Sequence, residues 1–313
     1  MVRLARLVIT LLAVSFGSFL LLNLLPGDPA TQILGLVNIN PANIARVHRE
    51  LGLDKPLLQR FVDWLGGVLT GDWGESYRTH EPVLGTILDR LPLTLELTLL
   101  AQFVALLTAA VIALVSAPRP GSVVDRASSA TSFGMLSLPN FVLGLGLIYF
   151  LAVQTGGWLP ATGYVPASES LTDNLRSMVM PVLTLAAAPA AVYARMLRSE
   201  LMVTLQEDYI AFARAKGLSP RYILLRHALR PSSLPLLTLS GINFGALMGG
   251  AFVIENLFAL PGVGSLGIDA IYRHDYLVVQ GVVLFITLMY VLVNFGVDLL
   301  YSTVDPRVRQ AGA

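Results

Sequence analysis

Long apolar stretches separated by shorter polar ones dominate the pattern of this chain. A bilayer core of about 30 Å is crossed by about 20 mostly apolar helical residues. Six stretches are long enough to span it: Leu7–Leu25, Leu93–Val115, Ala127–Val153, Met178–Leu197, Leu234–Val253 and Val278–Leu300. The pattern predicts an all-α fold, a polytopic membrane helix bundle of six transmembrane helices, with residues 1–313 forming one transmembrane domain.

Basic residues concentrate on one side of these predicted spans. One side holds the N-terminal segment, the second and fourth connections with the adjoining span ends, and the C-terminal segment. It carries thirteen basic residues: Arg3, Arg6, Arg119, Arg126, Arg195, Arg198, Arg214, Lys216, Arg221, Arg226, Arg230, Arg307 and Arg309. The short loops on the other side carry only Arg176 and Arg273. Because cytoplasmic loops are enriched in Lys and Arg, we expect both termini to be cytoplasmic.

Residues 26–91 form the longest connection, which is predicted to be an extracytoplasmic loop subdomain. Gly and Pro interrupt it too often for a span. Within it, Pro41–Leu51 and Pro56–Leu69 have the apolar spacing of two short amphipathic helices, and Gly71–Glu75 reads as a turn. Such a loop fits two roles equally well, a structural cap over the outer mouth or a contact for an extracytoplasmic partner.

The connection between the fourth and fifth spans contains a polar, basic segment, Glu207–Pro231, that is built like two short soluble helices. Asp208 is expected to cap a helix that begins near Tyr209. Three small residues, Ala211, Ala213 and Ala215, would make this helix thin enough for close approach by another element.

The same segment carries clear stop and start signals. Gly217 follows Lys216 where a glycine commonly ends a helix. Ser219-Pro220 is a typical helix start, and Pro231 is expected to stop the second helix. An ordinary positively charged cytoplasmic loop is the simpler alternative, but such a loop does not need helix stop and start signals.

Composition excludes several classes of protein. Hydrophobic residues make up 55% of the chain and charged residues 13%, about half the charged share of a soluble domain. The chain has no cysteine and a net charge of +1, so disulfides, thiolate metal sites and bulk attraction to nucleic acid are not expected. The four histidines are scattered, and we expect neither a metal site nor a catalytic residue.

Nucleotide-binding motifs are also missing. No phosphate-binding G-x-x-x-x-G-K-[ST] loop occurs, so we expect no bound cofactor, and another polypeptide must bind any ATP used. Gly262–Gly267 matches G-x-G-x-x-G by letter, but it lies between two spans without a βαβ context. We expect these glycines to form a turn.

Polar residues inside membrane spans are costly and are therefore candidates for function. Gln102, Asn140 and Asn243 lie within the second, third and fifth predicted spans, and Glu255 lies at the outer end of the fifth. They are candidates for lining a translocation path. For the first three, hydrogen bonds between helices are the slightly favoured alternative.

Several motifs together resemble one family. Tyr209–Gly217 with Arg226–Pro231 is similar to the coupling loop, or EAA motif, of ABC-importer permeases in the dipeptide, oligopeptide and nickel branch. Asn23–Pro29, Ser137–Phe141 and Glu255–Gly264 match the same branch in the same order. The general Glu-Ala-Ala of the motif is here Ala211-Phe212-Ala213.

The resemblance implies a type I ABC importer permease subunit that forms half of a translocation path for di- or oligopeptides. Residues 199–231 would be its cytoplasmic coupling loop. The candidate ATPase-coupling residues are Ala211, Ala213, Ala215, Lys216, Gly217, Arg221, Arg226 and His227. The implied partners are a homologous second permease, two cytosolic ATPase subunits that hydrolyse the ATP, and an extracytoplasmic substrate-binding protein.

The sequence leaves other cargoes open and gives less support to two other classes of function. Nickel chelates, glutathione and haem are alternative cargoes within the family. A self-sufficient secondary transporter would need an inverted repeat and an ionisable residue at mid-membrane, and neither is evident. An intramembrane hydrolase would need a nucleophile and base at matching depth, and no such pair stands out.

Overall fold

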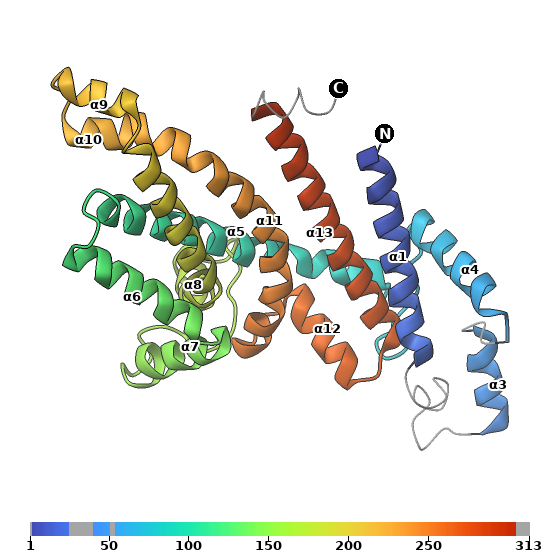
Figure 1. The fold of residues 1–313 in the computed structure, drawn as a ribbon. Helices are drawn as coiled ribbons and strands as arrows, with labels where there is room; N and C mark the ends of the chain where they lie inside the picture. Colours follow the sequence, from blue (N-terminus) through green and yellow to red (C-terminus); the bar gives the residue numbers. More distant parts are fainter. Residues whose placement is uncertain (1, 25–39, 51–53, 305–313) are drawn as a thin grey trace. The chain divides into compact units, whose positions relative to one another are not determined.

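The computed structural model describes residues 2–24, 40–50 and 54–304, and every regular element in these ranges is helical (Figure 1). The prediction of an all-α fold is therefore confirmed for this part of the chain. The residues group into two compact units. Unit 1 comprises residues 1–94 and 261–292, and unit 2 comprises residues 95–260 and 293–313.

The helices are α1 (Val2–Leu24), α3 (Pro41–Glu50), α4 (Leu57–Thr70), α5 (Val83–Ser116), α6 (Val123–Ser137), α7 (Asn140–Leu147), η1 (Ile148–Val153), α8 (Leu171–Thr204), α9 (Asp208–Ala215), α10 (Pro220–Tyr222), η2 (Ile223–Ala228), α11 (Leu229–Leu257), α12 (Val263–Tyr272) and α13 (Tyr276–Val304). The elements η1 and η2 are π-helices. The helices α5 and α13 each contribute residues to both units.

Unit 1 confirms the two short helices predicted after the first span. They are α3 and α4, although Leu51, the predicted end of the first, lies outside the described residues. The predicted turn also forms, because Gly71 ends α4 at a φ of +89° and the amide of Gly74 donates to the carboxylate of Asp72 over 3.0 Å. An aromatic cluster of Phe61 with Phe16 then holds α4 against α1.

Unit 2 is organised around α8, which packs against α6, α7 and α11 (Figure 1). Most of its middle is buried, including the large side chain of Tyr193. A helix that is apolar on all sides and surrounded by other helices is typical of the centre of a membrane bundle. It is therefore α8 that fixes the other helices of this unit.

The part of α5 in unit 2 has two distinct faces. Alanines at every fourth position, Ala101, Ala105, Ala109 and Ala113, have no exposed surface. Large apolar residues at the same spacing, Leu99, Phe103, Leu107, Val111 and Val115, are each more than half exposed. Small residues let membrane helices approach closely, so α5 packs through the alanines and presents the large residues outward.

The third predicted span, Ala127–Val153, is not one continuous helix, which corrects the prediction. It is broken between α6 and α7, whose axes differ by 102°. Leu138 adopts an extended conformation with φ −93° and ψ +126°. The reason is steric: a proline disfavours helical geometry in the residue before it, and here that proline is Pro139.

The helices at the second and fourth predicted spans, α5 and α8, are longer than the apolar stretches that predicted them. The second begins at Val83, inside the predicted outer loop of residues 26–91, and the fourth runs over Leu171–Thr204. Helical backbone hydrogen bonds continue past the ends of the apolar stretches, which hydropathy alone cannot show. The turn predicted at Gly262–Gly267 is also wrong, because from Val263 onward the segment forms α12, with Gly264 and Gly267 buried.

Four helices in the described part of the chain are long and apolar enough to cross a membrane, and the bent pair of α6 with α7 and η1 makes a possible fifth. The helix α1 covers the first predicted span up to Leu24, and Leu25 lies outside the described residues. The number of six spans and the side on which each terminus lies stay predictions.

Candidate functional site

The coupling segment, Glu207–Pro231, forms a helical hairpin that projects from one end of unit 2 (Figure 1). Its first helix, α9, ends as predicted. Gly217 has a φ of +79°, its amide donates to Arg214 O over 2.9 Å, and the amide of Leu218 donates to Ala213 O over 3.3 Å. This pair of bonds is a Schellman motif, which satisfies the last carbonyls of a helix and turns the chain.

The start of α9 differs by one residue from the prediction. Glu207, and not Asp208, occupies the cap position, and Asp208 is the first helical residue. No side-chain hydrogen bond caps this helix. Asp208 instead places a negative charge in the first turn, where it stabilises the positive end of the helix dipole.

The second helix begins as predicted but does not stop where predicted. Ser219 Oγ accepts the amide of Tyr222, and Pro220 occupies the first helical position. From Pro220 the helix runs without interruption to Leu257 over 38 residues. The expectation that Pro231 ends it is wrong.

A π-helix explains how the chain passes Pro231. A proline in an α-helix clashes with the carbonyl four residues earlier, which here belongs to His227. The preceding element η2, Ile223–Ala228, is a wider π turn, and such turns relieve the crowding at helix irregularities. The second helix of the coupling segment and the following span are therefore one continuous helix.

The two helices of the hairpin share a small apolar core. Ile210 and Ala213 of α9 and Ile223 and Ala228 of η2 are buried. At the base of the hairpin, Ser232 Oγ donates to Thr204 Oγ1 over 2.9 Å. Ala213, a candidate coupling residue, thus turns toward the chain's own helices, where its small size permits close packing.

The other candidate coupling residues are on the surface or partly so. Ala211, Ala215, Lys216, Gly217, Arg221 and Arg226 are exposed, and His227 is half-buried. The ammonium group of Lys216 lies 4.5 Å from the ring centre of Phe212, a cation–π contact. His227 packs edge-on against Tyr222, with ring centres 5.5 Å apart.

Sequence reasoning missed the apolar surface of the hairpin. Phe212 is 61% exposed, and Tyr209, Tyr222 and Leu225 are each nearly half exposed or more. Burial, followed by the negative charge of Glu207, raises the pKa of the Tyr209 phenol, which therefore stays neutral. The signal was present, because aromatic residues in an otherwise polar segment mark contact surfaces.

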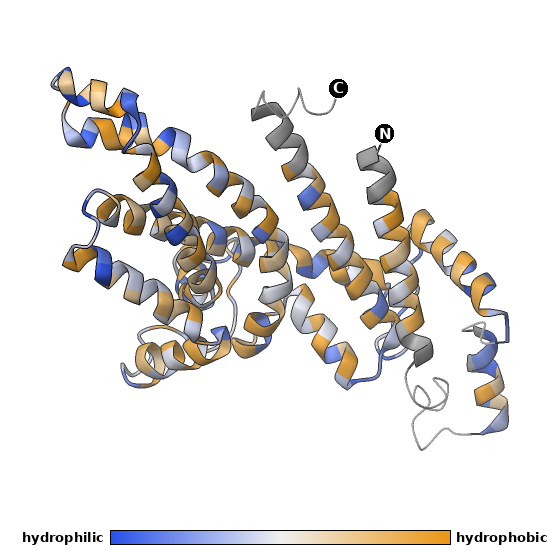
Figure 2. Cartoon of the chain, in the orientation of Figure 1, coloured by the Kyte–Doolittle hydropathy of each residue, from blue (hydrophilic) through white to orange (hydrophobic). Residues whose placement is uncertain are grey.

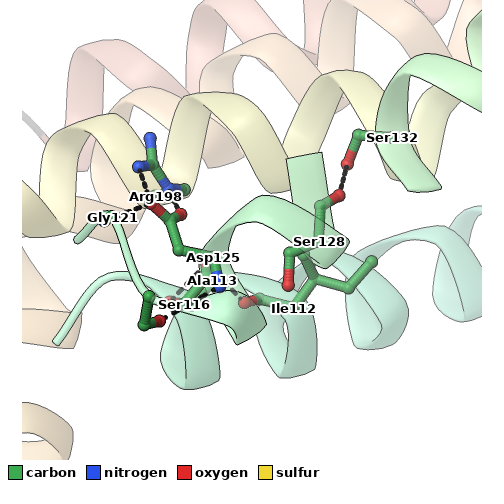
Figure 3. Close-up of polar contacts among 9 residues, drawn as sticks. Ile112, Ala113, Ser116, Gly121, Asp125, Ser128, Ser132 and Arg198 are labelled. Atoms are coloured by element: carbon green, nitrogen blue, oxygen red, sulfur yellow. Dashed lines mark hydrogen bonds and ion pairs between the residues drawn. The ribbon is translucent and has the colours of Figure 1, made fainter. Parts of the chain in front are cut away.

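A second missed feature is an ion pair near the same end of unit 2 (Figure 3). Arg198 of α8 donates through Nε and Nη2 to Asp125 of α6, over 2.6 and 2.9 Å. The Asp125 carboxylate also accepts the Gly121 amide over 2.9 Å, and Ser122 caps α6 by accepting the Asp125 amide. Bidentate pairs of this kind are strong and directional, so α6 and α8 are fixed to each other here.

Two of the predicted translocation-path residues come together inside unit 2. Gln102 of α5 donates to the carbonyl of Ser240 in α11 and accepts the hydroxyl of Tyr193 in α8, each over 3.3 Å. The side chain of Asn243 in α11 lies near the Tyr193 hydroxyl. These residues tie three helices together, as the favoured alternative in the sequence analysis predicts.

The other two path candidates lie elsewhere. Asn140 is the first residue of α7, half-buried at the bend after α6. Glu255 is fully buried near the end of α11, and its carbonyl accepts the Leu260 amide over 2.8 Å, which closes the turn before Pro261.

One polar contact closes the segment before α8. Tyr164 donates its hydroxyl to the carboxylate of Glu96 over 2.8 Å. Burial, together with this hydrogen bond to Glu96 and its charge, raises the pKa of Tyr164 to about 12. The phenol therefore remains a donor at any physiological pH and holds the loop after η1 to α5.

Comparison with known families decides the identity of this architecture. Residues 109–310 match the family described as binding-protein-dependent transport system inner membrane component. Residues 1–98 match the N-terminal membrane component of the same systems. The chain belongs to this family. It is a multi-pass inner-membrane permease subunit and not an enzyme, and systems of this family work with ATPase and substrate-binding partners.

Several curated relatives cover nearly the whole permease. It is 39% identical to a probable peptide ABC transporter permease of Sinorhizobium fredii over 98% of this chain and 97% of the relative. It is 37% identical to a di/tripeptide transport system permease of Pseudomonas aeruginosa and 38% identical to a glutathione transport system permease of Salmonella choleraesuis, with the same shares covered.

Among solved structures, the permease resembles a chain of the MetNI methionine ABC transporter in inward-facing conformations. The TM-score is 0.57 at 20% identity, over 71% of this chain and 97% of that one. At this identity the likeness shows the fold alone. It confirms the predicted type I importer permease architecture.

Proposed function

We propose that this permease, paired with a homologous second permease, forms the path by which an ABC importer takes up short peptides, and that the coupling segment docks the ATPase subunits. The observation that carries the docking role is the exposed apolar surface of Tyr209, Phe212, Tyr222 and Leu225 on an otherwise polar hairpin. Exposed aromatic clusters rimmed by charge are typical of protein interfaces. The surplus of basic residues in the same segment favours a cytoplasmic position.

The continuity of the second helix supports a mechanism for coupling. Closure of the ATPase subunits would move the hairpin, and the rod that runs from Pro220 to Leu257 would carry this motion into the bundle. The cluster of Gln102, Tyr193 and Asn243 joins that rod to α5 and α8. Motion of α11 would thus act on these two helices through the cluster.

The cargo proposal is supported by the relatives at 37–39% identity, which transport peptides or glutathione by name. Glutathione is itself a tripeptide, so short peptides are the shared chemistry. Residues 26–91 are placed on the extracytoplasmic side in this proposal, where the helices α3 and α4 would face the binding protein.

The test uses the complete transporter reconstituted in vesicles. Phe212→Ser should weaken retention of the ATPase subunits about tenfold, because an exposed aromatic anchor contributes at least 1 kcal/mol or so to an interface. Leu69→Ser is the matched control, since Leu69 is also an exposed apolar residue but lies on α4. Equal retention in both variants would refute the docking role.

The same vesicles test the cargo. Uptake of a labelled dipeptide should be inhibited by unlabelled di- and tripeptides in excess. It should not be inhibited by a nickel chelate or haem at the same concentration. Failure of all peptides to compete would overturn the peptide assignment while leaving the docking result intact.

A further inference from the structure

A cavity of about 750 Å³ lies between the coupling segment, the ends of α5 and α8 and the loop between α5 and α6. Three arginines line it, Arg119, Arg214 and Arg221, and no acidic residue does. The guanidinium group of Arg214 donates to the carbonyl of Leu205 over 3.5 Å. In the described ranges none of the three forms an ion pair, since the recorded pairs are Arg198–Asp125 and Lys55–Asp63. The charged residues that line the cavity are therefore all positive.

Apart from Gln206, the rest of the lining is apolar. Leu114 and Val115 come from the end of α5, and Met202 and Leu205 from the end of α8. Val115 is the last member of the exposed apolar face of α5 that begins at Leu99. The loop that follows is hydrophilic (Figure 2), so the cavity lies where this apolar face ends and the arginines begin.

The cavity and the proposed docking surface occupy different sides of the hairpin. Arg221 and Leu224 line the cavity, whereas Tyr222 and Leu225 are exposed and do not. Residues one position apart on a helix differ by about 100° in direction. An ATPase bound to the Tyr222 side would therefore leave the cavity open toward the membrane.

We propose that this cavity binds the headgroup of an anionic phospholipid from the cytoplasmic leaflet. The phosphate would lie among the three arginines, and an acyl chain would follow the exposed face of α5. Basic residues at the surface of an anionic membrane favour such binding. The choice of leaflet rests on the orientation in the proposed function, but the binding itself does not.

The lipid would join the α5–α6 loop, through Arg119, to the coupling segment, through Arg221. While the lipid is bound, the α5–α6 loop and the coupling segment would move only together. The lipid composition of the membrane would thus influence how well hydrolysis is coupled to uptake.

The experiment uses the assembled transporter in nanodiscs of phosphatidylcholine with increasing phosphatidylglycerol, and native mass spectrometry counts the retained anionic lipid. The double variant Arg119→Gln/Arg221→Gln should bind phosphatidylglycerol about tenfold more weakly. Arg126→Gln/Arg230→Gln is the control with the same change in charge. Both of its residues are exposed and neither lines the cavity.

Three results would overturn the proposal. Equal lipid affinity in the two double variants would show that the cavity arginines do not bind the headgroup. Inorganic phosphate binding as tightly as the lipid would show that the apolar lining plays no part. Loss of the ATPase subunits from Arg119→Gln/Arg221→Gln alone would assign these arginines to protein docking, which retention measured in the same preparation distinguishes from lipid loss.

Discussion

The coupling hairpin has two junctions that are built in opposite ways. One joins its two helices, and the other joins its second helix to α11. At Gly217 the chain turns sharply through a left-handed residue, and α9 ends. At Pro231, where a helix would ordinarily stop, the chain continues through a π turn into α11. The first junction fixes the shape of the hairpin, and the second makes it continuous with a span.

The difference shows which side of the hairpin transmits motion. On the incoming side, α8 ends at Thr204 before α9 begins, and Arg198 is bound to Asp125 of α6. On the outgoing side, no break separates Pro220 from Leu257. We therefore expect the α8 side to act as the fixed support and the α11 side to act as the lever.

The largest expected effect comes from breaking the lever. Ala228→Gly/Leu229→Gly places two glycines at the junction of η2 and α11, each of which weakens a helix by about 1 kcal/mol. ATP hydrolysis should persist while peptide uptake falls about tenfold or more, because the two become uncoupled. Both rates are measured in the same vesicles.

Leu229→Ala is the matched control for this prediction, because it removes the same side chain and keeps helical propensity. It should retain most of the uptake. An equal loss in the control would show that the Leu229 side chain matters and the continuity of the helix does not.

The second prediction loosens the fixed support. Asp125→Asn keeps the shape of the side chain but leaves Arg198, 27% exposed, without its carboxylate. Losing hydrogen bonds to a charged group costs about 2 kcal/mol, so the purified transporter should unfold at a lower temperature in a thermal scan. Asp125→Asn/Arg198→Gln should recover part of the loss, since neither charge is then left unpaired. Arg198→Gln is the second single variant, and a double variant as unstable as the sum of the two single ones would contradict this role for the pair.

The sequence predicted the elements that depend on local rules. The cap at Ser219, the proline at position 220 and the turn at Gly217 each follow from the chemistry of a few adjacent residues. The small helices α3 and α4 follow from apolar spacing within a single turn or two. Local backbone preferences therefore carry over into the fold.

Two of the errors concern prolines, whose effect depends on the turn that precedes them. Pro231 was expected to stop a helix and does not, whereas Pro139 was placed inside a continuous span and breaks it. The outcome depends on whether the preceding turn can widen, as η2 does, or becomes extended, as Leu138 does. The proline alone does not show which of these two conformations the preceding residues adopt.

The candidate site residues show that contacts between residues far apart in the sequence could not be predicted from it. Polarity within a span pointed to Gln102 and Asn243, and the structure brings them to one tyrosine. That tyrosine, Tyr193, gave no signal, because its ring is unremarkable in an apolar stretch. Nor did Asp125 and Arg198, since pairing across 73 positions is a property of how helices pack and not of spacing.

The smallest expected effect tests the other junction. Gly217→Val introduces a β-branched residue at a φ of +79°, which costs about 2 kcal/mol, although a Cβ there meets no atom within 4 Å. Gly217→Asn is the matched control, because asparagine tolerates left-handed geometry. We expect the Val variant to lose uptake a few-fold as the hairpin changes shape, and the Asn variant to retain it. If both variants lose uptake equally, the contact surface at residue 217 matters and its backbone does not. If neither does, the hairpin keeps its shape through its buried core of Ile210 and Ile223, and the turn is dispensable for coupling.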